Sequence, residues 1–89
     1  MVSQKVTIVN RRGLHARASA KLARVAAPFA AQVTVSKDGE SVNASSIMGL
    51  MMLGAARGDA ILIQTEGSDA EKALETLVGL VEDGFGEED

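Results

Sequence analysis

The segment KVTIVNRRGLHARASAKLARVAAPF, residues 5–29, decides the fold, because the spacing of its apolar side chains changes partway along it. Val6 and Ile8 alternate with polar neighbours, which is the period of a half-buried β-strand. From Ala16 the spacing lengthens to steps of three and four residues, as on one face of a helix, and Pro28 marks the end of that helix. A polar loop joins the two elements. The chain therefore opens with a strand, a loop and a helix.

The rest of the sequence continues to alternate between these two periods. An Asp-Gly turn separates two strand-like runs, residues 32–36 and 41–43, which is typical of a β-hairpin. A short helix rich in Met and Leu is expected to end at Leu53, and residues 60–66 read as another strand. The last helix has the clearest apolar stripe, formed by Ala70, Ala73, Leu74, Leu77, Val78 and Val81. The order β-α-β-β-α-β-α predicts an α+β fold, in which helices cover one face of a four-stranded sheet.

The ends of the last helix carry their own signals. Ser68 and Glu71 have the spacing of a capping box at its start, and Gly84 is expected to stop it. The tail, residues 85–89, is expected to be loose at its end.

Composition narrows the class of protein. At 89 residues the chain is expected to form one small domain, residues 1–89, with no linker. It has no Cys, which excludes disulfides and thiolate metal sites. No apolar run approaches the roughly 18 residues of a membrane span, and the first residues lack a secretory signal, so we expect a cytoplasmic protein without a membrane partner. An acidic net charge of −3 and only two aromatic residues argue against nucleic-acid binding.

Charge is distributed unevenly along the chain. The first 24 residues contain basic side chains and no acidic ones, whereas the last 24 are strongly acidic. This asymmetry predicts a basic face that meets acidic partners or phosphate.

The only histidine, His15, falls at the junction between the first loop and the first helix. Amides in the first turn of a helix lack intrahelical partners and point toward its positive end, where a phosphate gains charge-assisted hydrogen bonds. Arg17 is placed to add a guanidinium, and Gly13 removes bulk beside the ring. The positive end also disfavours the charged ring, which leaves a neutral nucleophile. These features make His15 a candidate phosphoryl acceptor.

Other interpretations of His15 remain open at this point. The simplest is a surface histidine that only caps the helix. A zinc site would need three or four protein ligands, and the chain offers no second His and no Cys. A self-contained hydrolase would need a carboxylate that the neighbouring sequence lacks, although folding could bring one.

Two surfaces near His15 are candidate docking sites. Arg17, Lys21 and Arg24 share a helical face, which is solvated in any case and could dock an acidic surface. In the Met-rich helix Leu50 and Leu53 are expected in the core, which leaves an exposed apolar patch unless the thin domain buries it too. The predicted partner-binding residues are Leu14, Ala16, Ala20, Lys21, Arg24, Ile47, Met48 and Met51.

Ser45 and Ser46 are both suited to cap the Met-rich helix. A regulatory phosphate on either would add roughly −1.5 to −2 charges beside the apolar patch.

The order of elements, with Gly13-Leu14-His15-Ala16-Arg17 before the first helix and Ser46-Ile47-Met48-Gly49-Leu50 at the second, resembles the HPr family over essentially the whole chain. HPr is the histidine phosphocarrier of the bacterial phosphotransferase system. The resemblance implies an open-faced β-sandwich, with a four-stranded antiparallel sheet and three helices on one side. It also implies that the chain is a stoichiometric carrier rather than an enzyme, needs no cofactor or metal, and acts as a monomer.

The same resemblance assigns roles to individual residues. It implies that His15 takes phosphate on Nδ1 from the phosphohistidine of enzyme I and passes it to the A component of an enzyme II or a regulatory counterpart. Arg17 matches the arginine of the phosphate site. Ser46 matches the serine that HPr kinase/phosphorylase modifies, which lowers acceptance of phosphate from enzyme I.

The chain departs from the family pattern at Ala18, where proline is usual; proline would stiffen the first helical turn. Its acidic ending is similar to the nitrogen-related branch, whereas the context of Ser46 is similar to the kinase-regulated type. Two other classes stay open: a binding module that signals only through phosphorylated Ser46, and a small-molecule sensor domain.

Overall fold

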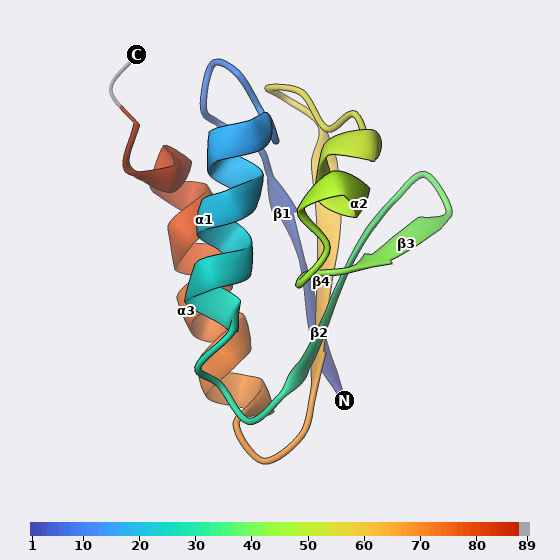
Figure 1. The fold of residues 1–89 in the computed structure, drawn as a ribbon, viewed down its shortest axis with the longest axis vertical. Helices are drawn as coiled ribbons and strands as arrows, with labels where there is room; N and C mark the ends of the chain where they lie inside the picture. The colour runs from blue at the N-terminus through green and yellow to red at the C-terminus, as the bar shows by residue number, and fades with distance from the viewer. Residues whose placement is uncertain (88–89) are drawn as a thin grey trace.

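Four strands form one antiparallel sheet in the order β1-β4-β2-β3 in the computed structural model, which describes residues 1–87 (Figure 1). The strands are β1 (Val2–Thr7), β2 (Gln32–Lys37), β3 (Glu40–Asn43) and β4 (Ala60–Glu66). Because β4 pairs antiparallel with both β1 and β2, the first and second strands run the same way and α1 (Ala16–Ala26) crosses between them.

The strands alternate as predicted, with one apolar face. In the register of the sheet Val6 lies opposite Ile61 and Val35 opposite Ile63, and all four side chains are buried. The intervening positions lie on the open face, where Lys5 and Ser36 are polar and their partner Leu62 is apolar. The β2–β3 hairpin turns at Asp38 and Gly39, which both have positive φ as a tight two-residue hairpin turn requires.

Three helices, α1, α2 (Ile47–Met52) and α3 (Ala70–Glu82), pack on the apolar face of the sheet (Figure 1). Each contributes a fully buried leucine, Leu22, Leu50 and Leu77, to one core. The predicted fold class, an α+β open-faced sandwich with four antiparallel strands and three helices on one face, is confirmed. None of the helices in residues 1–87 has the length and hydropathy of a membrane span.

The start of α3 differs from its prediction. Asp69, not Ser68, is the N-cap residue, and its side chain makes no capping hydrogen bond. The Asp69 carboxylate instead accepts from the backbone amide of Ala30 at 2.8 Å, and the Ser68 hydroxyl donates to the carbonyl of Ala30. The capping box is absent because both side chains tie down the loop between α1 and β2.

The tail is anchored at Phe85. Gly84 adopts positive φ and ends α3 as predicted, and a short 3₁₀ turn, η1 (Gly84–Gly86), follows. The Phe85 ring is only 2% exposed and belongs to the hydrophobic core. Phe85 is held in place because its apolar ring gains more by burial than the chain loses by ordering. The prediction of a loose end concerns the last residues of the tail. Residues 88–89 lie outside the described part of the chain.

Candidate functional site

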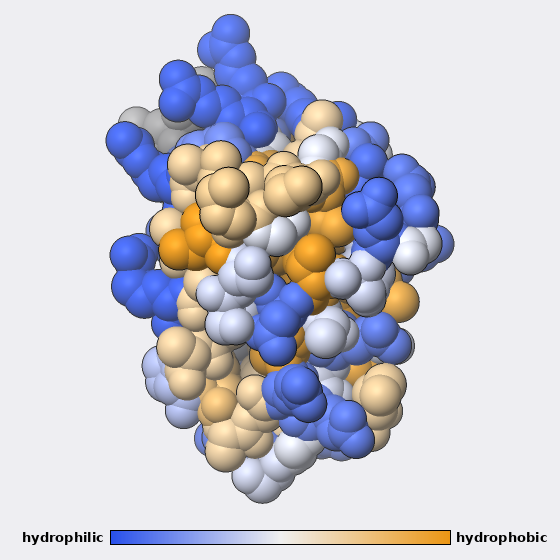
Figure 2. All heavy atoms as spheres, turned by 45° about the vertical axis from the view of Figure 1, so that its right-hand side comes forward, coloured by the Kyte–Doolittle hydropathy of each residue, from blue (hydrophilic) through white to orange (hydrophobic). Residues whose placement is uncertain are grey.

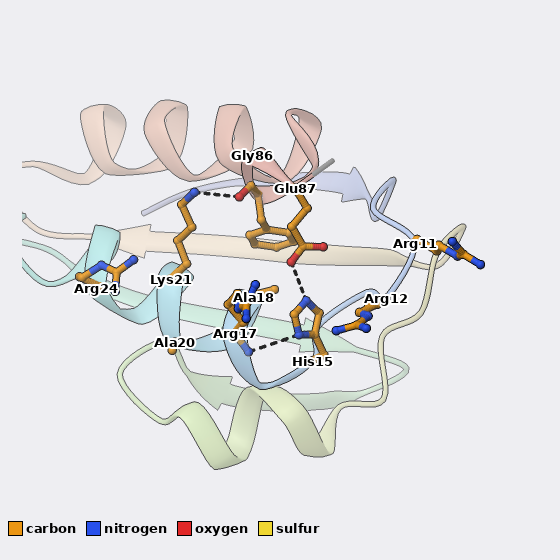
Figure 3. Close-up of a pocket in the computed structure, with 11 residues that line it drawn as sticks. Arg11, Arg12, His15, Arg17, Ala18, Ala20, Lys21, Arg24, Gly86 and Glu87 are labelled. Carbon is orange, nitrogen blue, oxygen red and sulfur yellow. Dashed lines mark hydrogen bonds and ion pairs between the residues drawn. The ribbon is translucent and has the colours of Figure 1, made fainter. Parts of the chain in front are cut away.

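His15 is the N-cap residue of α1, as the sequence predicts. Its backbone is extended, and its ring nitrogen Nδ1 accepts a hydrogen bond from the Arg17 amide at 3.3 Å (Figure 3). The ring therefore lies at the positive end of an 11-residue helix, against amides that have no intrahelical acceptor. The side chain is 22% exposed, so one edge of the ring is open to solvent.

The loop before His15 is held in place by a second loop. Gly13 has φ +62°, and a Cβ at this position would lie 2.2 Å from the carbonyl oxygen of Ala55. The Leu14 amide donates to that same oxygen at 2.9 Å. The absence of a side chain at Gly13 thus makes room for the second loop, whereas the sequence suggested that it makes room for the ring.

Leu14 was predicted in the docking surface, but the structure places it in the core. Its side chain is 4% exposed and packs in the hydrophobic core. The apolar side chain lies directly above the core at the point where the loop joins α1, so burial fixes the loop and leaves nothing for a partner to contact.

An open cavity of about 680 Å³ lies beside the ring. It is lined by basic side chains, by the start of α1 and by the C-terminal tail: Arg11, Arg12, His15, Arg17, Ala18, Ala20, Lys21, Arg24, Phe85, Gly86 and Glu87. The basic stripe Arg17–Lys21–Arg24 therefore faces the same cavity as His15 (Figure 3). Ala20 lines it as well, while Ala16 is exposed outside it. In residues 1–87 there is no group of three potential His, Cys, Asp or Glu metal ligands.

Lys21 has a structural contact that the sequence did not indicate. Its ammonium group donates to the carbonyl oxygen of Phe85 at 2.8 Å, which ties α1 to the C-terminal tail (Figure 3).

A carboxylate from the far end of the chain reaches His15. The Oε2 atom of Glu87 lies 2.5 Å from Nε2 of the ring, although the two residues are 72 positions apart. The second carboxylate oxygen accepts from the side-chain amide of Asn10 at 3.0 Å, and Asn10 itself is buried. Folding thus brings the carboxylate that the neighbouring sequence lacks. Phe85 and the glycines on either side of it could have suggested an anchored tail, but no local sequence pattern pairs Glu87 with His15.

The pKa of Glu87 is lower than its ordinary value. Burial raises it, but the hydrogen bonds from His15 and Asn10 and the charges of His15 and Arg12 together lower it by more. A lowered pKa favours the ionised carboxylate, so this contact stabilises the fold at neutral pH. The contribution is lost as the pH falls through the folded-state pKa of Glu87.

The structure shows which of the two serines caps α2. Ser46 is the N-cap, and its hydroxyl oxygen accepts from the Gly49 amide at 3.0 Å. The Ser45 hydroxyl instead donates to the side chain of Asn43 at 2.7 Å. Both serines are exposed.

The apolar patch on α2 is exposed, as predicted. Leu50 and Leu53 are buried, whereas Ile47, Met48 and Met51 are at least 38% exposed. Met52, which lies outside the predicted patch, is 77% exposed. Figure 2 shows this apolar area in the upper part of the molecule, bordered by hydrophilic side chains. The helix α2 packs against α1, the helix that carries the basic stripe.

Comparisons with known proteins agree with this architecture. The family model for the HPr component of the phosphotransferase system, described as "PTS HPr component phosphorylation site", matches residues 2–83. The phosphocarrier protein HPr of Cupriavidus necator is 46% identical over 87 residues, which cover 98% of each chain. The phosphocarrier protein NPr of Shewanella violacea is 40% identical over 86 residues, 97% of this chain and 94% of its own. A crystal structure of HPr from Thermoanaerobacter tengcongensis superposes with a TM-score of 0.94 at 44% identity, and the match covers all of both chains.

Proposed function

Because the chain belongs to the HPr family of phosphocarrier proteins of the phosphotransferase system, we propose that His15 accepts a phosphoryl group on Nδ1 from the phosphohistidine of enzyme I. The chain then passes the group to the A component of an enzyme II. The observation that carries this proposal is the position of Nδ1, which faces the amides at the positive end of α1 beside a cavity lined by basic side chains.

The transfer balances without any other reactant. The lone pair of Nδ1 forms a bond to phosphorus while the N–P bond in the donor breaks, and its electron pair returns to the ring of the donor histidine. The first-turn amides of α1 and the guanidinium of Arg17 are suited to hold the phosphoryl oxygens. The chain is then a stoichiometric carrier rather than an enzyme, because each group that it accepts is passed on.

The proposal is tested by incubating the protein with enzyme I and phosphoenolpyruvate. A phosphorus NMR spectrum should show a phosphohistidine substituted at Nδ1, and the label should be lost in acid. A known HPr serves as the positive control. Absence of label on this chain, under conditions that label the control, would contradict the proposal.

Docking is expected to use two neighbouring surfaces. The basic stripe suits an acidic partner surface, and the exposed methionines on α2 can adapt to more than one partner. We include in this surface Ala16, Ala20, Lys21, Arg24, Ile47, Met48 and Met51. A partner that covers both surfaces would enclose His15, which lies at the end of the helix that carries the stripe. We propose that the chain meets enzyme I and the acceptor in turn as a monomer.

Arg17→Ala is expected to slow transfer more than it weakens docking, because the guanidinium matters most when phosphoryl oxygens are in the site. We expect the rate at saturating enzyme I to fall about 10- to 100-fold. This is below the usual effect of removing one preorganised donor, because Arg17 is exposed. Transfer rates and NMR titrations on the same variant separate the two effects. Equal losses of rate and affinity would contradict this assignment of Arg17.

Ser46 is proposed as a regulatory site for HPr kinase/phosphorylase. Asp and Asn are both good N-cap residues, so Ser46→Asp and Ser46→Asn should each keep the start of α2 while only Asp adds a charge beside the patch. We expect Ser46→Asp to slow phosphorylation by enzyme I about 3- to 10-fold and Ser46→Asn to leave it near the wild-type rate. With the kinase and ATP, the wild type should gain an acid-stable phosphate that both variants lack. Equal rates for Asp and Asn would show that charge at this position has no effect on docking.

A further inference from the structure

The two nitrogens of the His15 ring have different partners, and both partners favour the same neutral form of the ring. Nδ1 faces the backbone amide of Arg17, which can only donate, so Nδ1 must carry the lone pair in this arrangement. Nε2 faces the Glu87 carboxylate at 2.5 Å, which accepts, so Nε2 carries the proton (Figure 3). The assignment of the proton follows from these hydrogen-bond partners.

The carboxylate is itself held in position from two sides. The side-chain nitrogen of Asn10 donates to Glu87 Oε1 at 3.0 Å and to the carbonyl of Gly13 at 2.9 Å, which links the tail to the loop before His15. Asn10 is 1% exposed, so this link is shielded from water. The tail is fixed further by the buried Phe85 ring and by the hydrogen bond from Lys21 to the Phe85 carbonyl. The position of the carboxylate is therefore set by packing before any partner binds.

We propose that Glu87 is a positioning residue for phosphoryl transfer: its carboxylate keeps the proton on Nε2 and so leaves the Nδ1 lone pair directed at the phosphate site. This inference rests on the proposed role of His15. It concerns a residue outside the part of the chain that the family model matches, residues 2–83.

The same contact is suited to assist the transfer step. When Nδ1 forms its bond to phosphorus, the donor N–P bond breaks toward the donor ring, and positive charge develops on the His15 ring. The Nε2 proton stays in place and continues to donate to Glu87, whose negative charge offsets the developing positive charge. A carboxylate behind a nucleophile-activating histidine acts similarly in hydrolase triads, where it fixes the tautomer and stabilises the imidazolium. The contact supports the reverse step, transfer to the acceptor, in the same way.

The test compares Glu87→Gln with Glu75→Gln. Glu75 is exposed on α3, so its replacement makes the same change in net charge away from the site. The first readout is the ¹⁵N chemical shifts of the His15 ring in the unphosphorylated protein, at a pH where the ring is neutral. We expect the Nε2–H tautomer to dominate in the wild type and in Glu75→Gln, and a mixture of the two tautomers in Glu87→Gln.

The second readout is transfer from phosphorylated enzyme I. We expect Glu87→Gln to lower the rate at saturation about 10-fold while the KM changes less than about 2-fold. This loss is smaller than that for a fully buried triad carboxylate, because Glu87 is 19% exposed. Glu87→Asp, which keeps the charge on a shorter side chain, should recover part of the rate.

The outcomes separate this inference from the proposed function. An unchanged tautomer ratio in Glu87→Gln would overturn it, and so would a transfer rate equal to that of Glu75→Gln. Faster transfer in Glu87→Gln would also overturn it, because the carboxylate would then obstruct the site. If wild-type His15 is not labelled at all, the proposed function fails, and the tautomer measurement still tests whether Glu87 fixes the ring.

Discussion

Replacement of His15 with alanine is expected to reduce phosphorylation by enzyme I and phosphoenolpyruvate to background. His15 is the only histidine in the chain, and its Nδ1 accepts a hydrogen bond from the Arg17 amide in the first turn of α1. The variant removes the acceptor atom itself, so the acid-labile label should disappear rather than form slowly. The measurement is incorporation of phosphate from labelled phosphoenolpyruvate, with the phosphorus NMR spectrum as a second readout.

His15 also caps α1, so the alanine variant changes structure as well as chemistry. His15→Asn provides the matched control, because asparagine is among the best N-cap residues and has no ring nitrogen to phosphorylate. Both variants should lose the label, and His15→Asn should retain more of the stability of the wild type. An acid-labile phosphate on either folded variant would place the acceptor elsewhere and contradict the role of His15.

Phe85→Ala is expected to produce the largest loss of stability. The ring is 2% exposed and completes the core between the end of α3 and the start of α1, so its removal leaves a cavity that the surrounding side chains cannot fill. We expect the free energy of unfolding to fall by about 3–5 kcal/mol. For a domain of this size, this corresponds to a decrease in Tm of roughly 15 °C or more. Chemical and thermal denaturation followed by circular dichroism measure the change.

The other aromatic residue provides the control for Phe85. Phe29 lies half-buried near the end of α1, and Phe29→Ala should cost about 1–2 kcal/mol because the ring already contacts solvent. Phe85→Ala should also release the tail, and the contact between Glu87 and His15 should then be lost. A loss of stability no larger than that of Phe29→Ala would show that the C-terminal turn is not part of the core.

Most of the fold follows from local patterns in the sequence. The alternation around Val6 and Ile63 and the helical stripe through Leu22 each record which side of an element is buried. Such a pattern repeats within a few residues, so it can be identified without the tertiary structure. The position of His15 at a helix start and the exposure of Met48 were predictable for the same reason. The capping box at Ser68 failed because the loop at Ala30 competes for the same side chains, and sequence spacing cannot represent that competition.

The sequence by itself thus determined the order of elements, the apolar face of the sheet, the helix end that bears His15 and the apolar patch on α2. Only the tertiary structure decided which group contacts Nε2 of the His15 ring. The contact between Glu87 and His15 depends on the buried Phe85 ring, on the Lys21 hydrogen bond and on the topology that brings the two ends of the chain together. A hydrogen bond across 72 residues leaves no periodic trace in the sequence, because its geometry is set by the packing of every element between the two partners.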